Sequence, residues 1–354
     1  MTKTAIRKNV FWFDDGKRPN VADSLERQSD LTVHRLEFDG PKEKNWRAIA
    51  ESQVYCITSA RHEVPDEYKC HAALIERCPH LLAVSTTGAG YDTVDVDACN
   101  AAGVLIVNQA GANAEAVAEH AVAMMLSLAK KIPQTDRSLR TERGVGREVF
   151  KGWNSQYRTI GVVGIGNVGS RLARICGKGL EMKVLAYDPY VSAEEIERRG
   201  ATKVDDLHTL LAQSWTLTIH CPLNDETRDM IGARELAAMP KGSYLITTAR
   251  GGIVTESALQ SALESGHIAG AGLDVWVEEP PPLAHPLLKR DDVIATYHTA
   301  GVTYDSRAAM ADWNAEQVGG ILRGERPPRL INPEAWDRYV ERFERIFGYR
   351  PGQK

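Results

Sequence analysis

The chain has 354 residues, of which 43% are hydrophobic and 25% charged, and it carries a formal net charge of −4. One hydrophobic core rarely serves a chain of this length, so two domains are expected. The mixed charges argue against a nucleic acid or a membrane surface as partner. The six cysteines show no CxxC or metal-ligand spacing. The cysteine spacing therefore predicts no metal site. The cysteines and the absence of a secretory signal at the start predict a cytoplasmic protein.

Short runs rich in valine and isoleucine alternate with helical patterns through the first third of the chain. The helical patterns cover residues 66–78 and 96–103. Strands that are buried on both faces read as continuous apolar runs, and their alternation with helices predicts a parallel sheet. The expected strands are 9–14, 31–38, 54–60, 81–87 and 104–109.

Residues 113–131 predict a long helix that begins at Asn113, with acidic residues in its first turns and two lysines at its end. After Glu119 the helix is apolar almost all round, so it must be buried on more than one side. Two interpretations have equal weight: a subunit interface of a homodimer, or a helix wedged between two domains of one chain. The polar residues 141–158 then connect to a second unit.

The strand–helix rhythm restarts after this connection and predicts a second parallel sheet. Its first strand runs directly into a glycine-rich turn. The expected strands are 159–166, 182–188, 215–221, 243–249, 268–275 and 293–298.

The glycine-rich turn has the spacing Gly164-x-Gly166-x-x-Gly169 between a strand and a helical pattern. Such glycines permit a tight turn, the close approach of a pyrophosphate and the packing of helix on strand. Asp188 ends the next strand, where a carboxylate binds the adenosine ribose and repels the 2′-phosphate of NADP. The pattern therefore predicts NAD as the cofactor. The alternative is a turn shaped by glycines alone, with Asp188 capping the next helix.

Ligands of open α/β sheets sit beyond the carboxyl ends of the strands. His220, Arg250, Asp274 and His298 all end strands of the second sheet, and Glu279 follows soon after Asp274. Reduction of a 2-keto acid needs a cation for the carboxylate, an acid for the carbonyl oxygen and an acceptor that orients the acid. An arginine, a histidine and a carboxylate provide these. On this reasoning alone His220 and His298 remain rivals for the acid.

From residue 81 to about 330 the chain resembles the D-isomer-specific 2-hydroxyacid dehydrogenases, the family of phosphoglycerate dehydrogenase, hydroxypyruvate reductase and D-lactate dehydrogenase. Residues 1–80 match only in their strand–helix rhythm. The matching segments, in the family's order, are TTGAGYDTVD, NQAGANAEAVAEHAVAMML, GVVGIGNVGSRLA, AYDP, HCPLNDETRDMI, TTARGGIV, GAGLDVWVEEP and YHTAG.

The resemblance implies the roles of individual residues. Arg250 would bind the substrate carboxylate, His298 would be the acid–base group and Glu279 its partner. The backbone of Ala89 and Gly90 would hold the carboxylate, with Arg250 and His298 completing the substrate site. Asp274 would hold the nicotinamide carboxamide, and His220 would line the cofactor cleft. The cofactor-binding set is Gly164, Gly166, Asn167, Val168, Gly169, Asp188, Pro189, His220, Pro222, Thr227, Thr248, Ala249, Asp274 and Gly301.

The implied fold is α/β with two doubly wound parallel-sheet domains and a cleft between them, which two linking helices let close. A Rossmann NAD-binding domain would span 113–304, and a flavodoxin-like substrate domain 1–112 and 305–354. Asn113 would lie near the cleft. Two positions depart from the family pattern, because Thr247 replaces an asparagine and Val277 an acidic residue.

We therefore expect an NAD-dependent oxidoreductase for a small D-2-hydroxy or 2-keto acid, with glyoxylate or hydroxypyruvate favoured. The alternatives are 3-phosphoglycerate, phosphite or formate dehydrogenase, and a corepressor-like protein that senses NAD(H). Formate dehydrogenase ranks low because that enzyme has glutamine at the position of Glu279. Arg61 follows the third strand and could meet a distal phosphate or carboxylate, although a solvated arginine is as good an interpretation.

Overall fold

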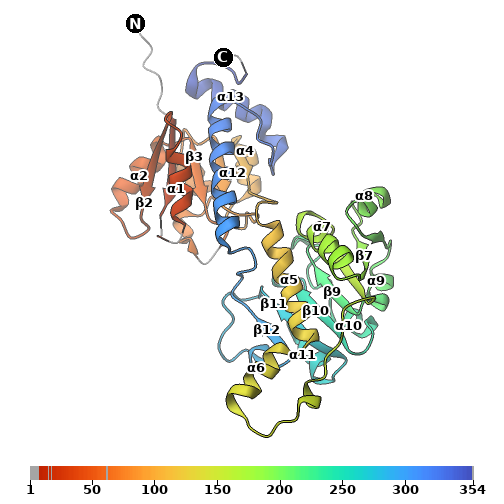
Figure 1. Cartoon of the computed structure of the whole chain (residues 1–354). Helices are drawn as coiled ribbons and strands as arrows, with labels where there is room; N and C mark the ends of the chain where they lie inside the picture. The colour runs from red at the N-terminus through yellow and green to blue at the C-terminus, as the bar shows by residue number, and fades with distance from the viewer. Residues whose placement is uncertain (1–7, 15, 17, 61–62, 353–354) are drawn as a thin grey trace. The chain divides into compact units, whose positions relative to one another are not determined.

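The computed structural model describes residues 8–14, 16, 18–60 and 63–352, so Arg61 lies outside the described residues. The chain forms two compact units (Figure 1). Unit 1 comprises Met1–Asn113 and Thr303–Lys354, and unit 2 comprises Ala114–Val302.

Unit 1 contains a five-stranded parallel sheet with the strand order β2-β1-β3-β4-β5. The strands are β1 (Lys8–Phe13), β2 (Leu31–Leu36), β3 (Val54–Ile57), β4 (Ala83–Thr86) and β5 (Leu105–Val107). Its helices are α1 (Pro19–Glu26), α2 (Lys42–Glu51), α3 (Ala72–Arg77), α4 (Val96–Ala102), α12 (Tyr304–Arg323) and α13 (Trp336–Phe347).

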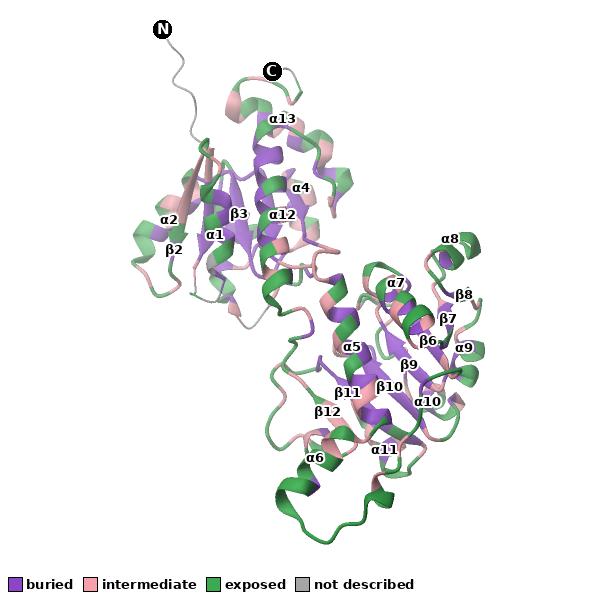
Figure 2. Cartoon of the chain, in the orientation of Figure 1, coloured by how far each residue is buried: buried purple, intermediate pink, exposed green. Residues whose placement is uncertain are grey.

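The sheet of unit 1 is buried on both faces, which explains its continuous apolar runs (Figure 2). Val10 and Trp12 of β1 face the layer of α1, α12 and α13, while Phe11 and Phe13 face α2, α3 and α4. The last two helices of the chain thus complete a core that the first hundred residues begin.

The helix expected over 66–78 is not continuous. A single 3₁₀ turn, Asp66–Tyr68, precedes α3, and the fully buried Cys70 between them forms an isolated bridge with Val94. The Cys70 N–H donates to the Thr93 carbonyl at 3.0 Å. A tertiary backbone contact therefore replaces the local helical bond that the apolar spacing favours.

Unit 2 contains a seven-stranded parallel sheet with the order β12-β11-β10-β9-β6-β7-β8. The strands are β6 (Thr159–Val163), β7 (Lys183–Tyr187), β8 (Thr202–Lys203), β9 (Thr216–Ile219), β10 (Ser243–Thr247), β11 (Ile268–Leu273) and β12 (Val293–Ala295). Its helices are α5 (Ala114–Ala129), α6 (Ile132–Thr141), α7 (Asn167–Arg174), α8 (Ala193–Arg198), α9 (Leu207–Gln213), α10 (Ala233–Ala238) and α11 (Glu256–Glu264). The two parallel sheets confirm the predicted fold class.

Helix α5 contributes most of its apolar side chains to the core of its own unit. Val122, Met125 and Leu128 pack with residues of α7, β6 and β10 in one buried cluster. Burial of these side chains within unit 2 accounts for the apolar surface that extends around most of the helix. In the described part of the chain, no helix combines the length and apolar character that crossing a membrane requires.

Candidate active site

The glycine-rich turn joins β6 to α7 and leaves the start of that helix exposed. Gly164 has a left-handed φ of +84°, and a Cβ there would lie 2.8 Å from the backbone nitrogen of Cys221. A Cβ at Gly169 would overlap the carbonyl oxygen of Gly164. Gly166 precedes α7, and a Cβ there would meet nothing within 4 Å. The turn is therefore closed on its inner side and open where a pyrophosphate needs access.

Asp188 follows β7 and is held beside this turn. Its carboxylate accepts hydrogen bonds from the backbone N–H of Ile165 at 3.1 Å and of Tyr190 at 3.1 Å. The alternative role, a cap for the following helix, is not what the structure has, because Ser192 caps α8. Asp188 stands where a ribose-binding carboxylate is needed.

The remaining residues of the predicted cofactor set lie at the carboxyl ends of the same sheet. Pro189 follows β7, His220 and Pro222 follow β9, and Thr227 closes the loop after Pro222 by donating to the Pro222 carbonyl at 2.7 Å. Asn167 and Val168 begin α7, Thr248 and Ala249 follow β10, Asp274 follows β11, and Gly301 follows β12.

The residues present fit a dinucleotide. Within the described residues, the buried hydroxyls of Thr247 and Thr248 have no hydrogen-bond partner. Buried polar groups are rarely left unsatisfied, so an orphaned hydroxyl at a strand end indicates a ligand contact. The open turn, the carboxylate of Asp188 and these hydroxyls together suit NAD.

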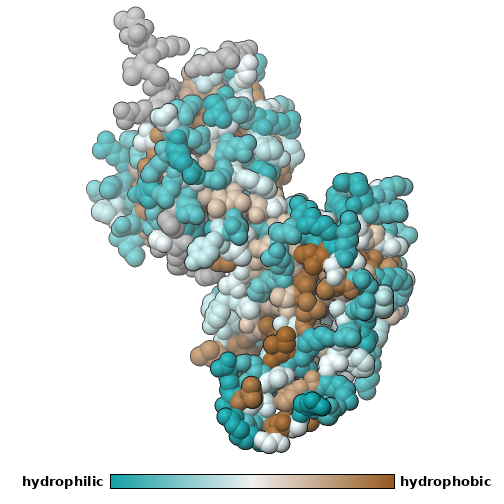
Figure 3. All heavy atoms as spheres, in the orientation of Figure 1, coloured by the Kyte–Doolittle hydropathy of each residue, from teal (hydrophilic) through white to brown (hydrophobic). Residues whose placement is uncertain are grey.

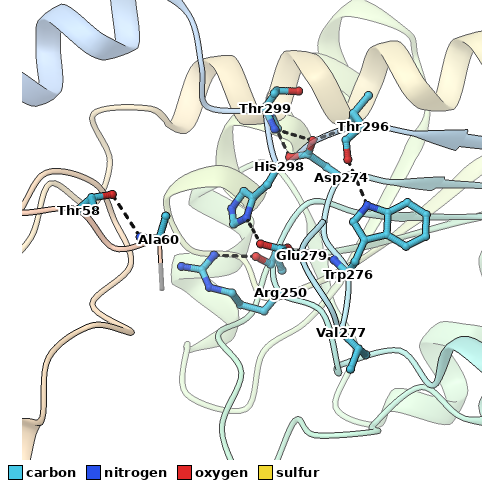
Figure 4. A network of polar contacts seen from close by, with 12 residues as sticks. Thr58, Ala60, Arg250, Asp274, Trp276, Val277, Glu279, Thr296, His298 and Thr299 are labelled. Atoms are coloured by element: carbon cyan, nitrogen blue, oxygen red, sulfur yellow. Dashed lines mark hydrogen bonds and ion pairs between the residues drawn. The ribbon is translucent and has the colours of Figure 1, made fainter. Parts of the chain in front are cut away.

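His298 and Glu279 form a pair beside this site (Figure 4). Nδ1 of His298 lies 3.0 Å from Oε2 of Glu279, which leaves Nε2 for a substrate. The His298 side chain is 43% exposed. Its backbone has a left-handed φ of 52°, an uncommon conformation that usually needs support from neighbouring groups. The Asp274 carbonyl gives part of that support, since it accepts the His298 N–H at 2.8 Å.

Glu279 is kept in its charged form. Burial raises the pKa of Glu279, but the hydrogen bond from His298 and the charge of Arg250 outweigh it and leave the pKa lowered. Arg250 follows β10, and its guanidinium lies on the same side as the pair (Figure 4). Its Nη1 donates to the Ala249 carbonyl at 2.7 Å. A cation, a proton carrier and an orienting carboxylate are thus assembled at one edge of the sheet.

His220 has a different environment. Burial lowers the pKa of His220 to about 4, so its imidazole is neutral near pH 7. The hydroxyl of Thr218 lies 2.8 Å from its Nε2. Unlike His298, it has no carboxylate hydrogen-bonded to it among the described residues. Of the two rivals, only His298 has the partner that stabilises an imidazolium.

The comparisons with known proteins agree with this geometry. Residues 122–300 match the domain described as "D-isomer specific 2-hydroxyacid dehydrogenase, NAD binding domain". The chain belongs to the D-isomer-specific 2-hydroxyacid dehydrogenase family. Residues 122–300 are therefore an NAD-binding domain of this family, which confirms the predicted cofactor and the resemblance.

Individual relatives carry several names within the family. A D-3-phosphoglycerate dehydrogenase from Archaeoglobus fulgidus is 41% identical over 261 residues, which cover 74% of this chain and 49% of that protein. A glyoxylate reductase from Korarchaeum cryptofilum is 35% identical over 266 residues, covering 74% of this chain and 80% of that protein. The crystal structure of an Aquifex aeolicus D-lactate dehydrogenase with NAD and lactic acid matches with a TM-score of 0.76 and 25% identity, covering 92% of this chain and 98% of that one. The chain spans about half the length of the phosphoglycerate dehydrogenases it matches.

Asp274 is held by hydrogen bonds from the turn that follows β12. The side chain is fully buried, and one oxygen accepts the Thr296 hydroxyl at 2.6 Å and the Thr299 N–H at 2.8 Å. The other oxygen accepts the Ala300 N–H at 2.9 Å. Asp274 thus fixes the turn that carries His298.

Glu256 and Gly251, which were not among the predicted site residues, hold the loop of Glu279. The Trp276 N–H donates to Oε1 of Glu279 at 3.1 Å, and the Val277 N–H donates to Oε1 of Glu256 at 2.9 Å. Gly251 packs so closely on the peptide between Trp276 and Val277 that a Cβ would lie 2.6 Å from the Val277 nitrogen. The pair of glycines in TARGG is a signal for Gly251, whereas Glu256 begins a helix and reads as a surface residue.

Proposed function

We propose that this chain is an NAD-dependent dehydrogenase that transfers a hydride between NAD(H) and C2 of a small D-2-hydroxy or 2-keto acid. The observation that carries the proposal is the His298–Glu279 hydrogen bond beside Arg250, at the sheet edge that also holds the cofactor turn. A nucleotide-sensing corepressor on this fold can retain the same residues, so turnover of a keto acid decides between the two.

Each residue of the pair has one task in this proposal. The bound nicotinamide supplies or accepts the hydride. In the direction of reduction, Nε2 of protonated His298 donates a proton to the carbonyl oxygen of the substrate. Glu279 stays ionised, holds Nδ1 and stabilises the imidazolium until the proton has left. Arg250 binds the substrate carboxylate and polarises the carbonyl.

We also propose that the backbone N–H groups of Ala89 and Gly90 in unit 1 bind the substrate carboxylate. The substrate we favour is glyoxylate or hydroxypyruvate. Arg18, the residue before α1, is paired with Glu63, which balances its charge. A substrate with a second, distal anionic group would need a cation that this pair does not supply.

The test is NADH oxidation with a panel of glyoxylate, hydroxypyruvate, pyruvate and 3-phosphohydroxypyruvate, repeated with NADPH, together with phosphite oxidation by NAD. We expect the highest kcat/KM for glyoxylate or hydroxypyruvate, and a preference for NADH because Asp188 disfavours a 2′-phosphate. Activity only with the phosphorylated acid or with phosphite would replace the substrate assignment. Tight NADH binding with no turnover on any compound would indicate a sensor protein.

The proposed assembly is a homodimer, and the proposed compartment is the cytoplasm. None of the six cysteines forms a disulfide, and five of them are buried, which supports a reducing compartment. Figure 3 shows apolar residues, in brown, among hydrophilic ones on the visible face of unit 2. Large apolar and aromatic side chains are also exposed on α6 and on the segment that follows it. They are Leu139, Val149, Trp153 and Tyr157, exposed by 74%, 61%, 55% and 78%. Exposed apolar side chains of this kind support a subunit interface formed by α6 and the segment after it, directly following α5 in the chain.

Replacing Leu139 with glutamate is expected to turn a dimer into a monomer, because a charge would be placed inside an apolar contact. Light scattering after gel filtration measures the mass. Leu283→Glu is the matched control, since Leu283 is 90% exposed and lies outside the segment. An unchanged mass for Leu139→Glu, or a monomeric wild-type chain, would remove this surface as the interface.

A further inference from the structure

We propose that a buried network of side-chain amides, anchored on α12, orients the peptides of Gly88, Ala89 and Gly90 so that they present two N–H groups to the substrate carboxylate. Asn108 and Gln317 are then positioning residues for substrate binding. The inference rests on the proposed function and extends it, because it identifies what sets the geometry of the carboxylate site in unit 1.

The loop of Gly88, Ala89 and Gly90 follows β4, and both of its inner carbonyls are hydrogen-bonded to the residues that follow β5. The backbone N–H of Gln109 donates to the Gly88 carbonyl at 2.8 Å. The side-chain amide of Asn108 donates to the Ala89 carbonyl at 2.6 Å. Two neighbouring carbonyls of the loop thus point toward the same segment.

This arrangement decides where the N–H groups point. The peptides of the loop are trans, and in a trans peptide the C=O and the N–H point in opposite directions. The N–H of Ala89 shares a peptide with the Gly88 carbonyl, and the N–H of Gly90 shares one with the Ala89 carbonyl. Both N–H groups therefore point away from residues 108 and 109.

Neither of these two N–H groups donates a hydrogen bond within the part of the chain that the structure describes. Gly90 is nevertheless a buried residue. A buried backbone donor without a partner is rare, so the N–H of Gly90 indicates a ligand that accepts, and the half-buried N–H of Ala89 lies beside it. Successive backbone N–H groups that face the same way are a recurrent anion site.

The network reaches back from this loop to α12. Nε2 of Gln317 donates to the Asn108 carbonyl at 2.9 Å and to Oε1 of Gln109 at 2.9 Å. Nε2 of Gln109 in turn donates to the Thr86 carbonyl at 3.0 Å. Gln109 is fully buried, and Asn108 and Gln317 are 4% and 2% exposed. Buried polar networks of this kind fix a single geometry when every member is satisfied.

The experiment compares Asn108→Ala with Asn45→Ala. Asn45 lies in α2 and is 2% exposed. Like Asn108, it donates a side-chain hydrogen bond to one backbone carbonyl, that of Glu37, at 2.8 Å. For Asn108→Ala we expect the KM for glyoxylate to rise about 10- to 100-fold, as for the loss of a hydrogen bond to a charged group. The kcat at saturation and the NADH dissociation constant should change little, because the carboxylate is held equally in the ground and transition states.

Binding of oxamate, an amide analogue of a 2-keto acid that is not reduced, is measured by calorimetry on the NADH-loaded chain and needs no turnover. It should weaken by the same factor in Asn108→Ala and stay unchanged in Asn45→Ala. Gln317→Met provides a second variant with the same expected direction if Asn108→Ala does not fold. Equal effects of the variants at 108 and 45 on oxamate, or a lower kcat with unchanged KM, would overturn the inference.

The outcomes separate this inference from the proposed function. A wild-type chain that binds oxamate but reduces no keto acid contradicts the function, while the comparison of the variants still decides the network. A wild-type chain that reduces glyoxylate while Asn108→Ala binds oxamate normally keeps the function and contradicts the network. A wild-type chain that neither reduces a keto acid nor binds oxamate contradicts both.

Discussion

Replacing His298 with alanine is expected to lower the kcat of keto-acid reduction by about 10²–10⁴-fold, the range for losing a positioned general acid. The imidazole is the group whose Nδ1 is held by Glu279 at 3.0 Å and whose Nε2 remains available. The NADH dissociation constant should be nearly unchanged, because no part of the cofactor turn is touched. Steady-state kinetics and fluorescence titration with NADH measure the two quantities.

His208→Ala is the matched control, since His208 is exposed on α9 and should keep the wild-type kcat.

The companion variant Glu279→Gln tests the same pair through pH. Because the pKa of Glu279 is lowered, its carboxylate is ionised throughout the neutral range. Without that negative charge the imidazolium is less favoured, so the alkaline limb of the kcat/KM profile for reduction should move to lower pH.

Three results would contradict this assignment. Full turnover in His298→Ala would show that another group donates the proton. An unchanged pH profile in Glu279→Gln would reduce the carboxylate to a loop residue. Loss of turnover in His220→Ala with wild-type NADH binding would move the acid to the histidine whose pKa burial lowers to about 4.

The strands and the residues that end them could be predicted from the sequence because their signals are local. Apolar runs locate β6, β9 and β10, and the glycine spacing locates the cofactor turn. Parallel strands share one carboxyl edge, so residues far apart in the chain, such as Arg250 and His298, could be placed together before any coordinates. The two-residue strand β8 is too short to show such a run.

The supporting contacts could not be predicted, because they join residues that have no local relation. The Gln317 amide and the Asn108 carbonyl are 209 positions apart. The helical spacing of 66–78 was a true local signal, but a backbone contact between Cys70 and Thr93 overrode it. Similarly, the apolar surface of α5 indicated burial without showing that its own unit covers it. Patterning predicts which face is buried and leaves the partner open.

Gly251→Ala is expected to lower kcat about 100-fold, the effect of displacing a catalytic group by about 1 Å. A Cβ at Gly251 would overlap the Trp276 carbonyl and lie 2.6 Å from the Val277 nitrogen, so that peptide must move. Its movement carries the Trp276 N–H that binds Glu279, and hence the carboxylate that holds His298. The glycine therefore acts on catalysis through two neighbours without touching substrate.

Gly179→Ala is the matched control for Gly251→Ala, since a Cβ at Gly179 would meet nothing within 4 Å and the backbone there is not left-handed. Both variants should bind NADH like the wild-type chain, whereas only Gly251→Ala should lose turnover and shift its pH profile in the direction of Glu279→Gln. Wild-type turnover in Gly251→Ala would mean that the loop moves without displacing Glu279. A loss of NADH binding that matches the loss of turnover would instead place the effect at the cofactor. The shared pH shift is what separates a displaced carboxylate from a general weakening of the fold, because unfolding lowers the amount of active protein and leaves the profile of the remainder unchanged.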